Sequence, residues 1–178
     1  MILLSLIVGF GLAEILSGVA RVLKVEGVKG LSWTHSAISM TVFVALLQTF
    51  WESWGLRSVE EWSFPAMLLL LAAPTFLFLA AHILSPEPGD SSSLDDYYYD
   101  RSRLIWALAG LTVIVGTFFR PLAFGMPLWV PDNLTAIPTL IVCILLSVVN
   151  ARWLHRVLVP LVLIIVILDT LAINYSIT

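Results

Sequence analysis

Hydrophobic residues in this chain gather in long runs instead of alternating with polar ones. Each run is close to the roughly 20 residues that a helix needs to cross the hydrocarbon core of a bilayer. Because the backbone polar groups inside a membrane must be satisfied within the segment, only helices suit runs of this length. The pattern predicts an all-α membrane protein, a single multi-pass domain (1–178) built as a bundle of about six transmembrane helices. The predicted spans are residues 2–23, 33–54, 63–84, 104–123, 134–151 and 156–176.

The composition supports this class. Hydrophobic residues make up 60% of the chain and charged residues 12%, against about 25% charged residues in a typical soluble domain. Spans and short loops use nearly the whole sequence, which leaves no room for a soluble catalytic or nucleic-acid-binding domain. We therefore expect no enzymatic activity, no nucleic-acid partner, no cofactor and no metal site. The expected partners are the lipid bilayer and either further copies of this chain, as a homo-oligomer, or another membrane protein.

Lysines and arginines are unevenly distributed among the connections. The first run has no basic residues before it, so we interpret Met1–Leu23 as a retained helix and not as a cleaved signal peptide. Cytoplasmic loops carry the excess of positive charge, so we expect the first, third and fifth connections in the cytoplasm and both termini outside. The default location is a bacterial inner membrane. Seven basic residues lie in those connections and two in the others: Arg21, Lys24, Lys29, Arg101, Arg103, Arg152 and Arg156, against Arg57 and Arg120.

Tryptophans mark the predicted span ends. Amphipathic rings are enriched at the level of the lipid headgroups, where they form an aromatic belt. All seven tryptophans fall at or near a predicted end: Trp33, Trp51, Trp54, Trp62, Trp106, Trp129 and Trp153.

Glu14 is a carboxylate in the middle of the first apolar run. A charge at that depth costs several kcal/mol unless it is paired, protonated or facing water, so it is a candidate functional residue. Ser17, Gly18 and Arg21 share its helix face at i+3, i+4 and i+7. Either Glu14 is a proton or ion site in a pathway, or it is a hydrogen-bonded group that fixes helix packing.

Other polar residues extend this candidate pathway. Thr41 and Gln48 follow one another at seven-residue spacing in the second run, and Glu52 lies one turn further on. This stripe could line a water-filled path, or it could hold neighbouring helices together by hydrogen bonds. Asp169 in the last run is a possible companion for Glu14, in which case the two carboxylates would share a proton.

The longest connection is Ser85–Arg103. Its first half has the proline, glycine, serine and acidic content of a flexible linker. Its second half is either an interfacial anchor, with the tyrosines among the headgroups, or a docking site for a partner. The candidate residues in that half are Asp95, Asp96, Tyr97, Tyr98, Tyr99, Arg101 and Arg103.

The two halves of the chain show a weak internal similarity. The second run closes on Trp51–Trp54 and the fifth on Asn150–Trp153, and a proline follows each, at Pro65 and Pro160. Two halves of three spans would form an inverted repeat, as in many transporters. The match is thin enough to be coincidence.

These patterns lead to two hypotheses of different classes. The first is a channel or transporter for a small solute or ion, with Glu14, Ser17, Thr41, Gln48, Glu52 and Asp169 along its pathway. The alternative is a non-transporting membrane scaffold or regulatory subunit that acts through residues 85–103.

Overall fold

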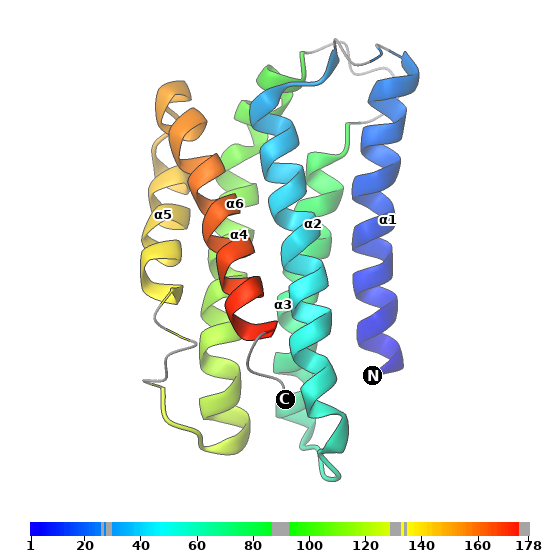
Figure 1. The fold of residues 1–178 in the computed structure, drawn as a ribbon, viewed down its shortest axis with the longest axis vertical. Helices are drawn as coiled ribbons and strands as arrows, with labels where there is room; N and C mark the ends of the chain where they lie inside the picture. Colours follow the sequence, from blue (N-terminus) through cyan, green and yellow to red (C-terminus); the bar gives the residue numbers. More distant parts are fainter. Residues whose placement is uncertain (26, 28–29, 87–92, 129–132, 134, 175–178) are drawn as a thin grey trace.

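A computed structural model describes residues 1–25, 27, 30–86, 93–128, 133 and 135–174. The described residues form six α-helices: α1 (Ile2–Val25), α2 (Trp33–Trp54), α3 (Phe64–Leu84), α4 (Leu94–Phe124), α5 (Ala136–Val148) and α6 (Arg152–Asn174), with a short 3-10 turn, η2 (Gly55–Ser58), after α2. The helices alternate in direction, and α1 begins and α6 ends in the lower part of the bundle in Figure 1. The predicted all-α, six-helix architecture is confirmed.

Four of these helices are long and apolar enough to cross a membrane: α1, α3, α4 and α6. Large hydrophobic side chains on their outer faces are exposed, including Phe10, Leu68 and Ile164. A surface of this kind suits lipid, since water would penalise it. The protein is therefore an integral, multi-pass membrane protein by the length and hydropathy of its helices.

Helix α2 is long enough to span but contains no stretch as apolar as the spanning parts of those four, and its position accounts for this. It contacts α1, α3, α4 and α6, so much of its surface faces other helices. Its buried residues include Thr34, His35, Ser39 and Thr41. A polar helix is tolerated at membrane depth when its neighbours shield it from lipid.

The span predicted for residues 134–151 was longer than the helix observed there. Helix α5 has 13 residues, a length of roughly 20 Å, which is less than the roughly 30 Å hydrocarbon core. It ends at Val148 because the chain turns there into α6. The Asn150 amide in this turn donates to the Tyr99 carbonyl over 3.2 Å, which ties the turn to α4.

The prediction that the loop extends to Arg103 was wrong. Helix α4 begins at Leu94 and has 31 residues. The Ser93 side chain accepts a hydrogen bond from the Asp96 backbone N–H, and Asp95 and Asp96 lie in the first turn. A serine N-cap followed by acidic residues favours a helix start through both hydrogen bonding and the helix dipole.

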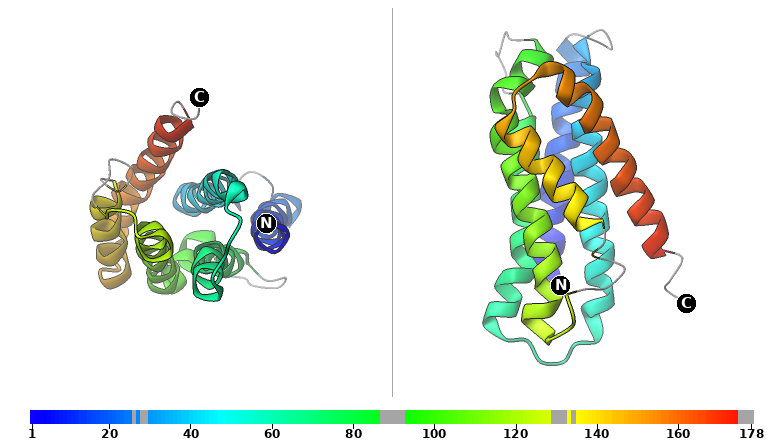
Figure 2. Two further views of the ribbon diagram at one scale, coloured as in Figure 1. Left: turned by 90° about the horizontal axis from the view of Figure 1, so that it is seen from below. Right: turned by 90° about the vertical axis from the view of Figure 1, so that its left-hand side faces the viewer.

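Helices α1 and α5 lie at opposite sides of the bundle, with α2, α3 and α4 between them (Figure 2). Helix α3 packs along α1, whereas α6 packs mainly along α2. The two halves are therefore packed differently, and the packing gives the predicted inverted repeat no support.

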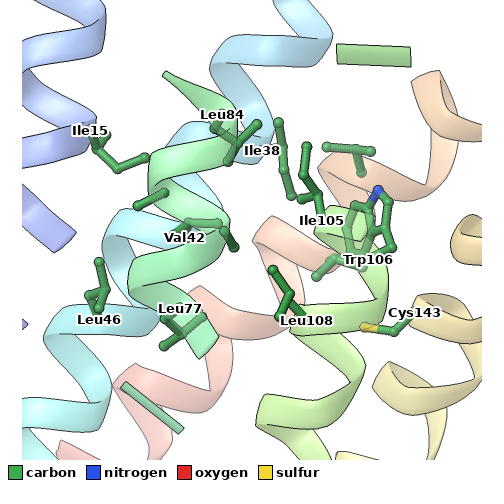
Figure 3. Close-up of a cluster of buried hydrophobic side chains, with 14 of the residues drawn as sticks. Ile15, Ile38, Val42, Leu46, Leu77, Leu84, Ile105, Trp106, Leu108 and Cys143 are labelled. Carbon is green, nitrogen blue, oxygen red and sulfur yellow. The ribbon is translucent and has the colours of Figure 1, made fainter. Parts of the chain in front are cut away.

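The core lies where these helices meet (Figure 3). Ile38, Leu46 and Leu84 are almost completely buried, as are Ile105 and Trp106. The assignment of Trp106 to an aromatic belt was therefore wrong, because its ring packs inside the bundle. Trp33 and Trp153, at 72% and 69% exposed, do lie on the surface at helix ends; Trp129 lies outside the described residues.

Candidate functional site

A pocket of about 340 Å³ lies in the lower half of the bundle, between α2, α3, α4, α5 and α6. Helices α5 and α6 are joined at their upper ends and separate toward the lower end (Figure 1), and residues from the lower ends of both line the pocket. Its lining extends along α4 from Arg120 to Thr112 and includes Met126 and Pro127 of the following loop. Its volume is at the lower end of the roughly 300–1,000 Å³ typical of small-molecule sites.

Gln48 organises the polar side of this pocket. Its amide nitrogen donates to Glu52 Oε1 over 3.0 Å and to Asp169 Oδ2 over 2.9 Å. Its amide oxygen lies 3.2 Å from the Thr170 hydroxyl, whose single proton is shared with the Val166 carbonyl at 2.7 Å. Because both amide protons go to carboxylates, one neutral side chain holds two acidic groups in fixed positions.

Asp169 connects this cluster to a third segment. Its other oxygen, Oδ1, accepts a hydrogen bond from the Thr135 hydroxyl over 3.0 Å, just before α5. The carboxylate thus joins α6 to α2 and to the start of α5. Its two hydrogen-bond donors are a neutral amide and a neutral hydroxyl, so they orient the carboxylate without cancelling its charge.

Among the described residues that line the pocket, Glu52 and Asp169 are acidic and Arg120 is basic. With all three ionised, the lining carries one net negative charge. Most of the remaining lining is apolar, with Leu69 and Val166 among it. The arrangement suits a solute that is small and either polar or positively charged.

The structure brings Gln48, Glu52 and Asp169 together and places the other predicted pathway residues elsewhere. Thr41 is buried in α2, where its hydroxyl donates to the Ala37 carbonyl of the same helix over 2.8 Å. Glu14 and Ser17 are on α1, away from the pocket lining. A role for Glu14 in a pathway stays a prediction.

Glu14 has its own partner, which the sequence did not identify. Its Oε1 lies 3.2 Å from His82 Nδ1 on α3. The Ser85 hydroxyl donates to the Glu14 carbonyl over 3.0 Å. These bonds tie α1 to the last turn of α3. Glu14 and Asp169 therefore have separate partners in separate parts of the bundle. The hypothesis that the two carboxylates share a proton finds no contact between them to support it.

The tyrosine segment that was expected to anchor in the headgroups or bind a partner is instead packed inside the bundle. Tyr97, Tyr98 and Tyr99 are 4%, 0% and 4% exposed. The Tyr97 hydroxyl lies within hydrogen-bond distance of the Ile83 and Ser85 carbonyls at the end of α3. The Arg101 guanidinium lies over the Tyr97 ring, with its central carbon 3.8 Å from the ring centroid.

Charged residues of the same segment also bind within the chain. Asp95 accepts a hydrogen bond from the Ser32 hydroxyl at the start of α2. Asp96 forms a 2.7 Å ion pair with Arg152, the first residue of α6. The beginning of α4 thus joins the upper ends of α2, α3 and α6. Asp100 and Arg103 are exposed on its outer side.

Tyr98 lies at the centre of a buried chain of hydrogen bonds. Trp106 Nε1 donates to the Tyr98 hydroxyl over 2.8 Å, and that hydroxyl lies 2.7 Å from His155 Nδ1. His155 Nε2 lies 3.1 Å from the Val149 carbonyl, which can only accept. Nε2 therefore carries the proton, Nδ1 accepts from Tyr98, and the imidazole is neutral.

Sequence reasoning missed Thr135 and Thr170, the hydroxyls that complete the pocket cluster. Thr170 follows Asp169 directly, so a polar pair in an otherwise apolar run was a usable signal. Nothing local marks Thr135, since its role depends on the position of α6 relative to α5.

The three histidines have different partners. His35 Nε2 lies 2.8 Å from the Leu84 carbonyl, His82 contacts Glu14 and His155 contacts Tyr98. Among the described residues, no group of three histidine, cysteine, aspartate or glutamate side chains is placed to hold a metal ion.

No protein-family model matches the sequence, and neither a curated protein nor a solved structure matches it. The geometry of the bundle therefore carries the functional argument.

Proposed function

We propose that this protein binds a small polar or charged solute in the pocket between α2, α3, α4, α5 and α6 and moves it across the membrane. The observation that carries the proposal is the Gln48 amide, which holds Glu52 and Asp169 together on one wall of a 340 Å³ pocket. Acidic groups inside a membrane bundle are expensive to keep, and they commonly mark a solute or ion path.

The position of the pocket supports entry from the lower end of the bundle. The loop after α4 contributes Met126, Pro127 and Asn133 to its lining. The upper end, in contrast, is joined by the contacts of Tyr97, Tyr98 and Tyr99. The unequal distribution of lysine and arginine favours the upper end as cytoplasmic, so the pocket would open toward the outside of a bacterial inner membrane.

The alternative of a scaffold that acts through residues 85–103 has less support. Asp95, Tyr97, Tyr98 and Tyr99 are engaged in contacts within the chain. A partner that used these side chains would have to displace bonds that join four helices.

Flux measurements on reconstituted protein test the proposal. Purified wild-type protein and Asp169→Asn would be reconstituted in proteoliposomes and assayed with sodium, potassium, protons, small amino acids and small amines. We expect flux of at least one solute above empty liposomes and a reduction of about tenfold or more in Asp169→Asn.

Glu61→Gln is the matched control, because Glu61 is an exposed carboxylate in the connection between α2 and α3, at the same end of the bundle and outside the pocket lining. It should transport as the wild type does. Wild-type flux at background for every solute would refute the proposed function.

A further inference from the structure

The walls of the pocket are more apolar than their sequence implies. Thr49, Thr112, Thr117 and Thr139 all line it. Each of their hydroxyls donates to the carbonyl four residues earlier in the chain, over 2.7 to 3.0 Å. With their protons bound to the backbone, these hydroxyls cannot donate to a solute, and the threonines can offer it only methyl groups and oxygen lone pairs.

Aliphatic side chains complete these walls. They come from three different helices, with Leu69 and Leu70 on α3, Val113 on α4, and Ile165 and Val166 on α6. A hydrated inorganic ion gains little from surfaces of this kind, whereas an apolar group loses its contact with water there.

The charge of the pocket is concentrated where α2 meets α6. Glu52 and Asp169 are joined there through Gln48. Arg120 on α4 also lines the pocket, so the lining contains one guanidinium and two carboxylates. The hydrogen bonds of Asp169 come from the Gln48 amide and the Thr135 hydroxyl, both of them neutral. A positive group beside Asp169 would be attracted strongly, because apolar surroundings weaken the screening of charge.

From these observations, and building on the proposed function, we infer that the pocket takes small organic cations that carry an apolar body, with the cationic group at Asp169 and the body against α3, α4 and α6. Gln48 and Thr135 act as positioning residues that hold the carboxylate toward the solute. The apolar walls select against small hydrated ions, and the net negative charge selects against anions.

Equilibrium binding to the purified full-length protein in lipid nanodiscs, measured by isothermal titration calorimetry, tests this inference. Three probes of nearly the same size differ in charge: 2-phenylethylammonium, 2-phenylethanol and phenylacetate. Methylammonium has the cationic group without the apolar body. We expect 2-phenylethylammonium to bind at least about tenfold more tightly than each of the other three. Empty nanodiscs correct for partition into lipid.

Asp169→Asn should lower the affinity for 2-phenylethylammonium to that for 2-phenylethanol and leave the affinity for 2-phenylethanol unchanged. Glu61→Gln should preserve the preference of the wild type. If Asp169→Asn does not fold, the comparison of probes on the wild type decides the question by itself. Equal affinity for the three phenyl probes, tighter binding of phenylacetate, or equal affinity for methylammonium would overturn the inference.

The binding and flux results separate this inference from the proposed function. Selective cation binding without flux in proteoliposomes would refute transport and support the assignment of the pocket. Flux without preference for 2-phenylethylammonium over 2-phenylethanol would support transport and overturn the assignment.

Discussion

At the scale of single residues, Tyr98 shows how a buried polar group is retained in an apolar bundle. Its hydroxyl accepts from Trp106 and donates to His155, and His155 in turn donates to the Val149 carbonyl. Tyr98, Trp106 and His155 are all at most 1% exposed. Each donor in this chain of hydrogen bonds has an acceptor in the next group. The bonds therefore specify how α4 packs against α6 and the turn before it.

Tyr98→Phe is predicted to destabilise the protein without changing its shape. The substitution leaves the Trp106 N–H and His155 Nδ1 without their shared partner, and an unsatisfied buried polar group costs about 1–3 kcal/mol. The free energy of unfolding in detergent, followed by circular dichroism, measures the loss.

Thr75→Val is the control for Tyr98→Phe, because the Thr75 hydroxyl bonds only the Leu71 carbonyl of its own helix over 2.7 Å. Its free energy of unfolding should change by less than about 1 kcal/mol. Equal losses in the two variants would contradict a special role for the Tyr98 network.

At the scale of helices, the contact of α1 with α3 depends on a close approach at Gly18. A Cβ atom at this position would lie 2.7 Å from Ser85 Oγ and 3.2 Å from Ser85 Cβ. The 2.7 Å distance is too short for atoms that are not bonded, so either the Ser85 hydroxyl must turn away from the Glu14 carbonyl or α1 must move outward. The same approach allows the Ser85 hydroxyl to reach the Glu14 carbonyl.

Gly18→Ala is accordingly predicted to lower the free energy of unfolding by about 1–3 kcal/mol, the usual cost of overpacking. Gly9→Ala is the matched control on the same helix, since nothing lies within 4 Å of its Cβ position. It should be neutral or stabilising by up to about 1 kcal/mol, because alanine is the better helix former. Thermal unfolding of both variants makes the comparison, and a stable Gly18→Ala would show that α1 is not held at this point.

The beginning of α4 shows how far local sequence can predict an element. Its longer, later part, residues 104–123, is an apolar run and was predicted to be a helix, as observed. Its first ten residues are polar and were assigned to a loop. The signal that could have corrected this assignment was Ser93 before Asp95 and Asp96, a helix start independent of hydropathy. The burial of the tyrosines, in contrast, depends on α3 and α6 and could not be predicted from this segment alone.

At the scale of the whole molecule, the alternation of six helices places Glu60 and Asp100 at opposite ends of the bundle. Glu60 is exposed in the connection after α2, and Asp100 is exposed near the start of α4. Because α3 runs between them, these two positions must face different compartments if α3 crosses the membrane.

Single-cysteine labelling measures this topology. In a Cys143→Ala background, a membrane-impermeant maleimide should label Glu60→Cys in intact cells and Asp100→Cys only after the membrane is opened, as expected if the basic end is cytoplasmic. The reverse result would invert the orientation. Labelling of both positions from one side would show that α3 does not cross.

The sequence by itself determined the class of the protein and the number of its helices. Both follow from the length and hydropathy of each run, which are local properties. The pairing of residues was decided only by the tertiary structure. Gln48 and Asp169 are 121 positions apart, and Glu14 meets His82 instead of Asp169. A span's own residues require it to be a helix, but its neighbours depend on how all six pack together. The pocket that joins Gln48, Glu52 and Asp169 is therefore a property of the bundle and not of any single run.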